Sequence, residues 1–331
     1  MSARRNRDRG PASEPACPAG ACPASQAPVT PSSEGPIIRA RGVSLVYLAG
    51  TPFETWALRE LDLELRTGEL IGIVGSTGSG KSTLIQTLCG LLDASAGQIE
   101  YGAGIDAASP PTSIGLVFQQ PEDQIFERTV QEEVAFGPRQ LGLPEPEVQA
   151  RVRAALEAVG MPVTESLQRS PFEMSGGEKR RVAIASLLAM KPRMLIFDEP
   201  TAGLDASGRR QLLQHIRRLH TEQGCTVILV SHDMEMLAGL VERLLVMVDG
   251  RLKALDRPAA IYSRPELLAE AGLRAPVWVE LLAALQARGL PVRADLLEVE
   301  TAITEIRRAI AEGKKLSKTR SGAPLPNPRQ G

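Results

Sequence analysis

One nine-residue stretch of the chain could hold a row of phosphates. It consists of Gly75, Ser76, Thr77, Gly78, Ser79, Gly80, Lys81, Ser82 and Thr83. These residues fit the pattern G-x-x-x-x-G-K-[ST], in which backbone N–H groups surround the phosphates. In that pattern the lysine, here Lys81, reaches the β- and γ-phosphates, and the next hydroxyl, here Ser82, binds Mg²⁺. The stretch therefore predicts a site for a nucleoside triphosphate with Mg²⁺.

The flanks of this phosphate loop agree with that interpretation. The sequence predicts an apolar strand over 70–74 and a helix over 82–92. A strand, a glycine turn and a helix N-terminus together form an anion site, because N–H groups and the helix dipole point at the ligand. The alternative is a chance glycine turn, which would not require a strand before it or a helix after it.

Polar residues follow three other predicted strands. Asp198 and Glu199 follow the apolar run 194–197, Gln119 follows the run 114–118, and His232 lies just beyond 225–230. Ligands of open α/β sheets bind beyond the carboxyl ends of the strands, so these side chains are expected at one edge. There Asp198 could hold Mg²⁺ through water, and Glu199 is free to act as a base. Adjacent surface acids are usually only solvated, but the buried strand and the phosphate loop favour function here.

A second helix start in the chain could also bind an anion. Ser175 is suited to cap a helix that runs to about residue 189, and Gly176 and Gly177 leave its first N–H groups accessible. One nucleotide does not need two such helix starts from the same subunit. Two in one chain therefore suggest that nucleotides are shared across a dimer.

Tyr47 is an aromatic residue placed upstream of the phosphate loop, with Phe53 and Trp56 nearby. Aromatic residues are scarce in this chain, at 3%. The Tyr47 ring could stack on a nucleotide base, which gains from ring–ring contact. Packing in the core is the competing interpretation.

The composition is that of a globular protein without a strong net charge. The 331 residues include 38 basic and 39 acidic ones, so no strong field recruits nucleic acid or a membrane surface. No apolar run approaches the ~18 residues of a membrane span, so a membrane role would act through a partner. Cys89 and Cys225 are expected in the core. Cys17 and Cys22 have no second pair to complete a zinc site.

The order of the predicted elements indicates an α/β protein with appendages. Residues 1–35, rich in proline and alanine, are expected to be disordered. Further strands are predicted over 36–47, 58–65, 98–101, 244–248 and 251–255, the last two joined by a turn at 249–250. A helix is predicted over 145–160, whereas 120–143 is expected to be irregular. His215 and His220 are expected on the surface of a polar helix at 206–223.

The last part of the sequence is predicted to be helical from about residue 258. Two apolar stripes are read as core patterns, one of which could pack against a partner. They consist of Trp278, Leu281, Leu282 and Leu285, and of Val299, Ile303, Ile306 and Ile310. The basic tail at 313–331 is expected to be disordered.

In this order, the motifs resemble the nucleotide-binding subunit of an ABC transporter over about residues 37–255. By resemblance, Gln119 is the Q-loop glutamine, Ser175-Gly176-Gly177-Glu178 the signature motif, and Asp198 and Glu199 the Walker B motif with its catalytic glutamate. Asp205 falls in the D-loop and His232 is the switch histidine. The resemblance implies an α/β ABC ATPase fold over 36–256, in which a P-loop NTPase core carries an antiparallel β subdomain and a helical subdomain at about 120–190. A C-terminal helical extension over 257–312 follows.

A narrower resemblance is to the ATPases of energy-coupling factor (ECF) importers of the cobalt and vitamin type. It is carried by VFQQPEDQIF at 117–126, Thr129-Val130 and VAFGP at 134–138, with support from TPFE at 51–54 and RRVAIA at 180–185. Met174, Glu178 and Ala206 stand where leucine, glutamine and proline are common. None of these departures removes a catalytic group, so an active site is expected.

The resemblance implies a transport ATPase that uses ATP and Mg²⁺ at the cytoplasmic face of the cell membrane, as a peripheral subunit. Two ATPase subunits, identical or related, would pair head to tail and hold each ATP between the phosphate loop of one and the signature motif of the other. Ser82, Gln119 and Asp198 would bind Mg²⁺, Glu199 would polarise the attacking water, and His232 would contact the γ-phosphate. A transmembrane coupling subunit would dock near 120–143, with a substrate-capturing membrane subunit attached indirectly.

The nearest alternative is an ATPase of a non-ECF ABC transporter, which would share every catalytic residue. A soluble ABC ATPase of DNA repair, chromosome organisation or translation is a more distant one. Repair and chromosome types place a coiled coil between Gln119 and the signature motif, but only 56 positions separate Ser175 from Gln119, without heptads. Translation factors carry two ATPase cassettes, and GTPases carry an N-K-x-D motif that this sequence lacks. The balanced charge also argues against a nucleic-acid partner.

Overall fold

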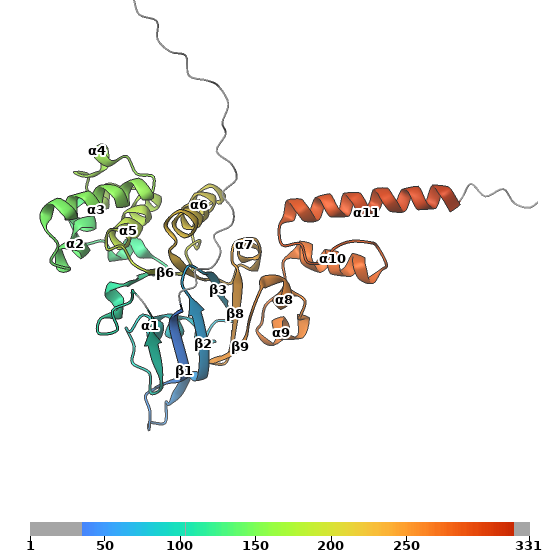
Figure 1. The fold of residues 1–331 in the computed structure, drawn as a ribbon, viewed down its shortest axis with the longest axis horizontal. Helices are drawn as coiled ribbons and strands as arrows, with labels where there is room; N and C mark the ends of the chain where they lie inside the picture. Colours follow the sequence, from blue (N-terminus) through green and yellow to red (C-terminus); the bar gives the residue numbers. More distant parts are fainter. Residues whose placement is uncertain (1–34, 103, 321–331) are drawn as a thin grey trace, which may run out of the picture. The chain divides into compact units, whose positions relative to one another are not determined.

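The strands of the computed structural model form two sheets (Figure 1). The structure describes residues 35–102 and 104–320, so Cys17 and Cys22 lie outside the described residues. An antiparallel sheet of three strands has the order β2 (Thr55–Arg66), β1 (Pro36–Tyr47), β4 (Ala96–Tyr101). A second sheet has the order β5 (Ile114–Val117), β6 (Met194–Asp198), β7 (Thr226–Val230), β3 (Leu70–Val74), β8 (Arg243–Val248), β9 (Arg251–Asp256). The predicted α/β class with an antiparallel subdomain is confirmed.

The larger sheet is parallel except at one edge. Strands β5, β6, β7, β3 and β8 run in the same direction, and only β9 pairs antiparallel, with β8. The predicted hairpin turn is confirmed, with φ values of 47° at Asp249 and 75° at Gly250. Two successive positive φ values are what a two-residue turn needs to match the twist of its strands. Because the other strands are parallel, their carboxyl ends meet at one edge of the sheet.

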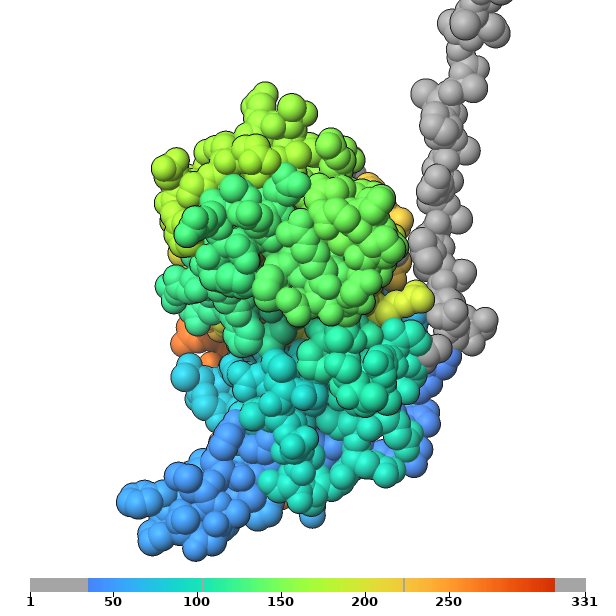
Figure 2. All heavy atoms as spheres, turned by 90° about the vertical axis from the view of Figure 1, so that its left-hand side faces the viewer, coloured from blue at the N-terminus to red at the C-terminus, as the bar shows by residue number. Residues whose placement is uncertain are grey.

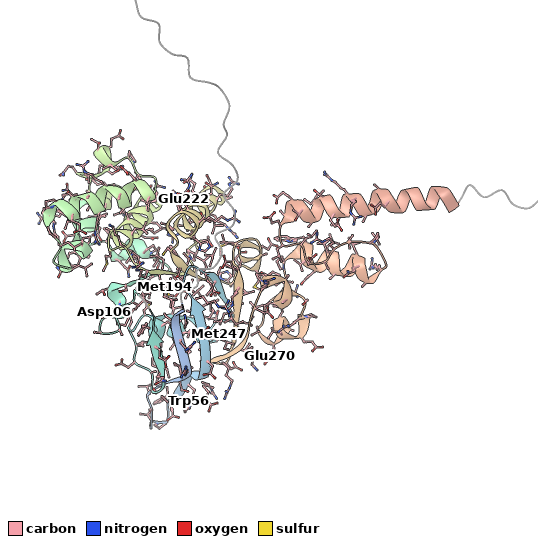
Figure 3. All side chains as sticks on the ribbon, viewed as in Figure 1. Trp56, Asp106, Met194, Glu222, Met247 and Glu270 are labelled. Carbon is pink, nitrogen blue, oxygen red and sulfur yellow. The ribbon has the colours of Figure 1, made fainter. Side chains whose placement is uncertain are left out.

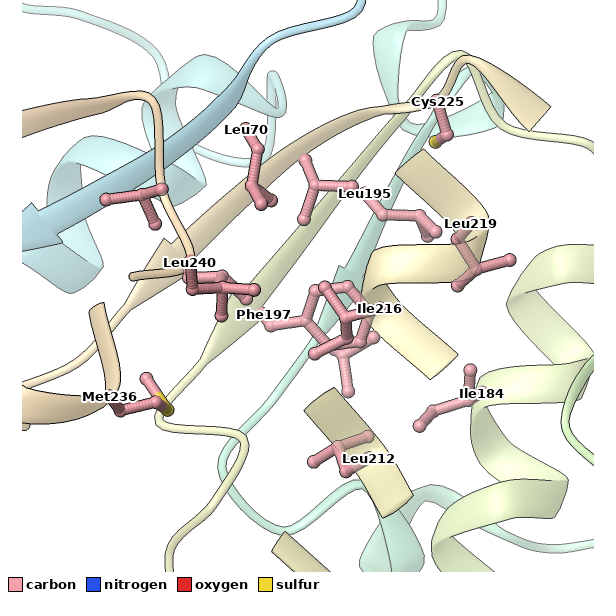
Figure 4. Packing of buried hydrophobic residues seen from close by; sticks show 14 of the residues in the cluster. Leu70, Ile184, Leu195, Phe197, Leu212, Ile216, Leu219, Cys225, Met236 and Leu240 are labelled. Carbon is pink, nitrogen blue, oxygen red and sulfur yellow. The ribbon is translucent and has the colours of Figure 1, made fainter. Parts of the chain in front are cut away.

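Alternate residues of the central strands face two different cores. In β6, Leu195 and Phe197 join the cluster formed with α6 (Ala206–Gln223) and its neighbours, and Figure 4 shows these side chains with Ile216. Met194 and Ile196 join the opposite cluster, formed with β1, β2 and α1 (Lys81–Leu88). Each fully buried side chain of this kind contributes about 1.5–3 kcal/mol. Packing on both faces therefore fixes the strand ends that carry the polar residues.

Side-chain exposure follows the same layering. Met194 and Met247 are fully buried within the sheet layers, whereas Trp56 lies near the end of the β1–β2 hairpin and is 45% exposed (Figure 3). Cys89 and Cys225 are buried and unpaired, as predicted.

A group of helices is inserted between β5 and β6. Its members are α2 (Val130–Gln140), α3 (Glu145–Ala158), α4 (Val163–Ser166) and α5 (Gly176–Ala189). Helices α2, α3 and α5 pack on one another, and the surface of α2 and α3 faces the viewer in green in Figure 2. Short 3₁₀ turns lie at Pro110–Thr112, Pro121–Gln124 and Pro171–Glu173.

The prediction that 120–143 is irregular is wrong, because this segment contains α2. The Thr129 side chain caps the helix by accepting a hydrogen bond from the Glu132 N–H. Val130 and Val134 are fully buried, in the same core as α5. Pro138 lies in the last turns of α2, where it removes only one helical hydrogen bond. Burial of the apolar face outweighs the low helix propensity of Gly137 and Pro138.

The C-terminal part is helical, as predicted. Of its two predicted apolar stripes, the first packs in a core through Trp278, Leu282 and Leu285, whereas most of the second is exposed. It contains α8 (Pro258–Tyr262), α9 (Pro265–Glu270), α10 (Val277–Ala287) and α11 (Val299–Arg320), whereas the short α7 (Met234–Ala238) lies earlier, between β7 and β8. Among the residues of α11 whose side chains the structure describes, Ala302 and Ala309 are buried, and they pack with Leu282 of α10. Small side chains let the two helices approach closely, so the larger Ile303 and Ile310 are left 45% and 46% exposed. The disordered tail expected from 313 is also wrong at its start, because α11 continues to Arg320.

None of the helices that the structure describes is both long enough and apolar enough to span a membrane.

Candidate active site

The phosphate loop lies between the end of β3 and the start of α1, as predicted. Gly75 and Gly80 have φ values of 154° and 100°. An added Cβ would lie 2.4 Å from the Met247 carbonyl oxygen at Gly75, and 2.4 Å from the Ala57 carbonyl oxygen at Gly80. Only glycine fits such a close approach of backbone to backbone. The loop is therefore wedged between β8 and β2 with its shape fixed.

Lys81 bends back over this loop. Its Nζ donates hydrogen bonds of 2.8 Å to the carbonyl oxygens of Gly75 and Ser76. Burial lowers the pKa of Lys81, while the carboxylates of Glu199 and Asp198 oppose that shift. The cation is thus held at the mouth of the loop, next to both acids, where a phosphate can replace its carbonyl partners.

Asp198 ends β6 and reaches the start of α1. The Ser82 hydroxyl donates to Asp198 Oδ2 at 3.3 Å, which joins residues 116 positions apart in the sequence. Burial raises the pKa of Asp198, the bond from Ser82 lowers it, the neighbouring Glu199 raises it, and Lys81 lowers it. A hydroxyl and a carboxylate oxygen at this distance form a donor set that suits Mg²⁺, which binds few protein oxygens beside phosphates and water.

Glu199 and His232 are in direct contact. Glu199 Oε1 accepts a hydrogen bond from the His232 backbone N–H at 3.1 Å and lies 2.8 Å from its Nδ1. Pairing of Asp198 with Val230 in the parallel sheet brings these residues together, and the buried Ser231 places its Oγ 3.4 Å from Glu199 Oε2. Glu199 has a φ of 48°. A non-glycine residue in this region is strained, and such strain gathers at functional sites.

Gln119 lies at the same edge of the sheet, because it follows β5, the neighbour of β6. The residue is exposed, and its backbone carbonyl accepts a 3.0 Å hydrogen bond from Arg180 Nη2. The predicted strand-end position is confirmed for Gln119, Asp198, Glu199 and His232.

The signature segment forms the predicted capped helix start. Ser175 Oγ accepts from the Glu178 N–H at 3.3 Å, and Glu178 Oε2 accepts from the Ser175 N–H at 3.0 Å. These reciprocal bonds form a capping box, which leaves the exposed N–H groups of Gly176 and Gly177 for a ligand. In the part of the chain that the structure describes, nothing lies within 4 Å of a Cβ added at either glycine. The two glycines share a surface hollow with Gln119, whose lining includes no residue of the phosphate loop.

Two other residues that the sequence predicts to contact the nucleotide, Tyr47 and Asp205, lie on different elements. Tyr47 ends β1, is 39% exposed, and its hydroxyl lies 3.3 Å from Thr83 Oγ1 at the phosphate loop. A ring that is accessible beside the loop favours stacking over core packing. Asp205 caps α6, where its Oδ1 accepts a 2.7 Å bond from the Gly208 N–H.

The expected surface position of two histidines is wrong, since His215 and His220 are only partly exposed. His220 Nδ1 contacts the Cys225 carbonyl oxygen at 3.3 Å, and its Nε2 lies 3.5 Å from Glu242. His215 lies over a small apolar cavity between α5 and α6. The pattern of polar residues did not predict this partial burial, because each ring lies at the boundary between the buried and exposed faces of α6.

Arg180 is a positioning residue that the sequence did not single out. It is buried, with 6% of its surface exposed, and donates to the carbonyl oxygens of Pro200 at 2.9 Å, Ala202 at 3.4 Å and Gln119 at 3.0 Å. It therefore links the signature helix to the Q-loop and to the loop after Glu199. The available signal was an arginine shortly before the apolar run 182–185 of the helix, which is buried.

Comparison with known proteins shows the family to which the chain belongs. The family model for ABC transporters matches residues 58–202, and the class is that of the ABC transporter ATPases. The ECF transporter ATP-binding protein EcfA2 of Caldanaerobacter subterraneus subsp. tengcongensis is 44% identical over 286 residues, covering 84% of this chain and 99% of that protein. EcfA2 of Symbiobacterium thermophilum is also 44% identical, over 82% of this chain and 96% of its own length. The chain belongs to the family of ECF transporter ATP-binding proteins.

Solved structures extend the comparison. The structure of cbiO1 from Clostridium perfringens, described as part of the ABC transporter complex cbiONQ, matches with a TM-score of 0.63 and 32% identity over 76% of this chain and all of that one. The dimeric structure of MJ0796, described as a bacterial ABC transporter cassette, matches with a TM-score of 0.58 and 28% identity over 67% of this chain and 98% of that one. The ABC ATPase fold predicted from the motifs is confirmed.

Proposed function

We propose that this chain is the ATP-binding and hydrolysing subunit that powers an ECF-type importer of vitamins or transition-metal ions. It would work as a peripheral subunit at the cytoplasmic face of the cell membrane. The observation that carries the proposal is the 44% identity to EcfA2 over 99% of that protein. The contacts of Lys81, Asp198, Glu199 and His232 support it, because they bring the groups needed for ATP hydrolysis to one edge of the sheet.

Two such subunits, identical or related, would bind ATP together. The phosphate loop of one would hold the nucleotide, and Ser175, Gly176 and Gly177 of the other would donate to its γ-phosphate. The open space around both glycines supports this arrangement, since a helix start with accessible N–H groups is an anion site. Asp205, exposed before α6, would line the nucleotide from the opposite subunit.

Within each site the chain's own residues would divide the work. Lys81 would exchange its two carbonyl partners for phosphate oxygens and stabilise the charge that develops during transfer. Glu199 would orient the attacking water and accept its proton, while His232 would contact the γ-phosphate. Tyr47 would stack on the base. Ser82, Asp198 and Gln119 would hold Mg²⁺, which when bound offsets the negative charge of the β- and γ-phosphates.

The segment 120–143 would receive the transmembrane coupling subunit. Phe126 and Phe136 in this segment are 56% and 40% exposed, with ring centroids 4.9 Å apart at 88°. An exposed aromatic pair suits an apolar helix of a membrane partner. Glu133 holds this surface in place by accepting from the N–H groups of Phe126 and Glu127 at 3.1 and 2.9 Å. Because Gln119 directly precedes the segment, nucleotide binding and docking would be coupled.

The domain boundaries belong to the same proposal. The ATPase domain would span 36–256, with its helical subdomain at about 120–190, and the C-terminal extension would begin at 257. The substrate-capturing membrane subunit would be reached only through the coupling subunit.

Affinity purification of the tagged chain from detergent-solubilised membranes of its host, followed by mass spectrometry, tests the proposal. We expect a second ATPase copy or paralogue, a transmembrane coupling protein and a small substrate-capturing membrane protein. A conventional permease with a soluble binding protein would retain the ATPase assignment but reject the ECF importer. Recovery with ribosomes or DNA alone would reject transport.

A further inference from the structure

Glu178 places a negative charge in the first turn of the signature helix. Its Oε2 accepts from the Ser175 N–H at 3.0 Å and from the Ser175 hydroxyl at 2.8 Å. Its Oε1 accepts a 2.8 Å hydrogen bond from Arg169 Nη1. The bond from Arg169, followed by those from Ser175, lowers the pKa of Glu178 to about 2. The carboxylate is therefore ionised at neutral pH.

This charge has opposite effects on folding and on ligand binding. A carboxylate at a helix N-terminus stabilises the helix, because it offsets the positive end of the dipole. The same charge opposes a phosphate that approaches the N–H groups of Gly176 and Gly177. Glutamine, which is common at this position, would form the capping box without that repulsion. The chain thus needs a compensating cation beside its signature motif.

Arg169 supplies that cation and is held in place by its backbone. Its N–H donates to the Ser166 carbonyl oxygen at 3.0 Å, and its carbonyl oxygen accepts from the Val130 N–H at 3.1 Å. The start of α2 therefore fixes the Arg169 backbone. The side chain remains 45% exposed, so its remaining N–H groups face solvent on the surface that carries the signature motif.

We propose that Arg169 is a positioning residue of the signature site, which neutralises Glu178 and so allows the start of α5 to accept the phosphates of ATP held by the paired subunit. The inference rests on the head-to-tail arrangement proposed above. It predicts that the need for Arg169 depends on the charge at position 178.

A double-mutant cycle on ATP hydrolysis by the purified, assembled transporter tests this dependence. We expect Arg169→Ala to raise the KM for ATP roughly tenfold, a typical coupling for a contacting charged pair. Arg169→Lys should retain most of the affinity, because the charge is kept. Adding Glu178→Gln to Arg169→Ala should return the KM to within about twofold of the starting value. The control Arg39→Ala breaks an ion pair of the same 2.8 Å length in the antiparallel sheet and should change nothing.

The double variant separates charge balance from damage to the fold, because a misfolded protein would not recover on a second substitution. An unchanged KM for Arg169→Ala, or a double variant that fails to recover, would overturn the inference. Ser175→Arg, placed at the helix start itself, tests the underlying arrangement. If Ser175→Arg abolishes hydrolysis while Arg169→Ala does not alter it, only the role of Arg169 is rejected. If Ser175→Arg also hydrolyses ATP normally, the head-to-tail site is rejected.

Discussion

Replacing Glu199 by glutamine separates ATP binding from ATP hydrolysis. Glutamine has nearly the same size as glutamate. In the unaltered protein the His232 N–H donates to Glu199 Oε1 at 3.1 Å, and the amide oxygen of glutamine can still accept this hydrogen bond. The substitution removes only the charge and the capacity to accept a proton. The phosphate loop and the two hydrogen bonds of Lys81 are untouched. Binding should therefore persist while the chemical step slows.

The expected loss follows from the role of a proton acceptor. A positioned acid–base group contributes about 10²–10⁴ in rate. Its loss adds about 3–5 kcal/mol to the barrier, at 1.36 kcal/mol for each factor of ten. ATP affinity should stay equal or rise, because a negative charge next to the phosphates disappears.

Phosphate release by the assembled complex and retention of labelled ATP measure the two effects separately. Glu157→Gln, on the exposed face of α3, is the matched control and should hydrolyse ATP normally. Hydrolysis by Glu199→Gln within a few fold of the unaltered complex would refute the assignment of Glu199 as the base. Loss of ATP binding would refute the separation of the two functions.

Three further substitutions test other parts of the site. Tyr47→Ala should weaken ATP binding by about 0.5–1.5 kcal/mol through lost stacking, as measured by equilibrium titration, whereas Phe53→Ala, 75% exposed, should not. Gly80→Ala should abolish ATP binding and cost about 1–3 kcal/mol of stability, because the residue has a φ of 100° and a backbone oxygen lies 2.4 Å from the new Cβ. The control Gly224→Ala, at a φ of 64° with nothing within 4 Å of the new Cβ, should cost only about 1–2 kcal/mol of stability. Denaturant titration measures both losses. Arg180→Met should cost about 2–5 kcal/mol, because three backbone carbonyls lose a buried donor; a midpoint equal to that of the unaltered protein would contradict this.

The predictable part of the fold followed from local patterns. The phosphate loop, the strand ends and the hairpin at 249–250 each depend on a few adjacent residues with a fixed backbone requirement, so the sequence located them. The strand β1 was predicted with the bounds Pro36–Tyr47 that the structure gives. The positions of Asp198 and His232 at one edge followed from the rule that parallel strands end together.

The missed features depend on tertiary contacts. Helix α2 carries Gly137 and Pro138, which disfavour a helix locally, and it forms because Thr129 caps its start and Val130 and Val134 are buried. The packing of α11 through Ala302 and Ala309 depends on the approach of α10, which hydrophobic periodicity does not report. The carbonyl contacts of Arg180 join segments up to 61 positions apart, so no local pattern predicted them.

Mixing two inactive variants tests the central claim, that each ATP lies between two subunits. In the Glu199→Gln background, one tagged copy carries Lys81→Ala and the other Ser175→Arg; if the complex holds two different ATPases, the equivalent substitutions are divided between them. The account predicts that mixed dimers retain ATP in one intact site, formed by the unaltered phosphate loop and the unaltered signature motif, while dimers of either variant alone retain none. Mixed dimers that form but retain no ATP would contradict the shared site, and with it the head-to-tail arrangement on which the proposed mechanism depends.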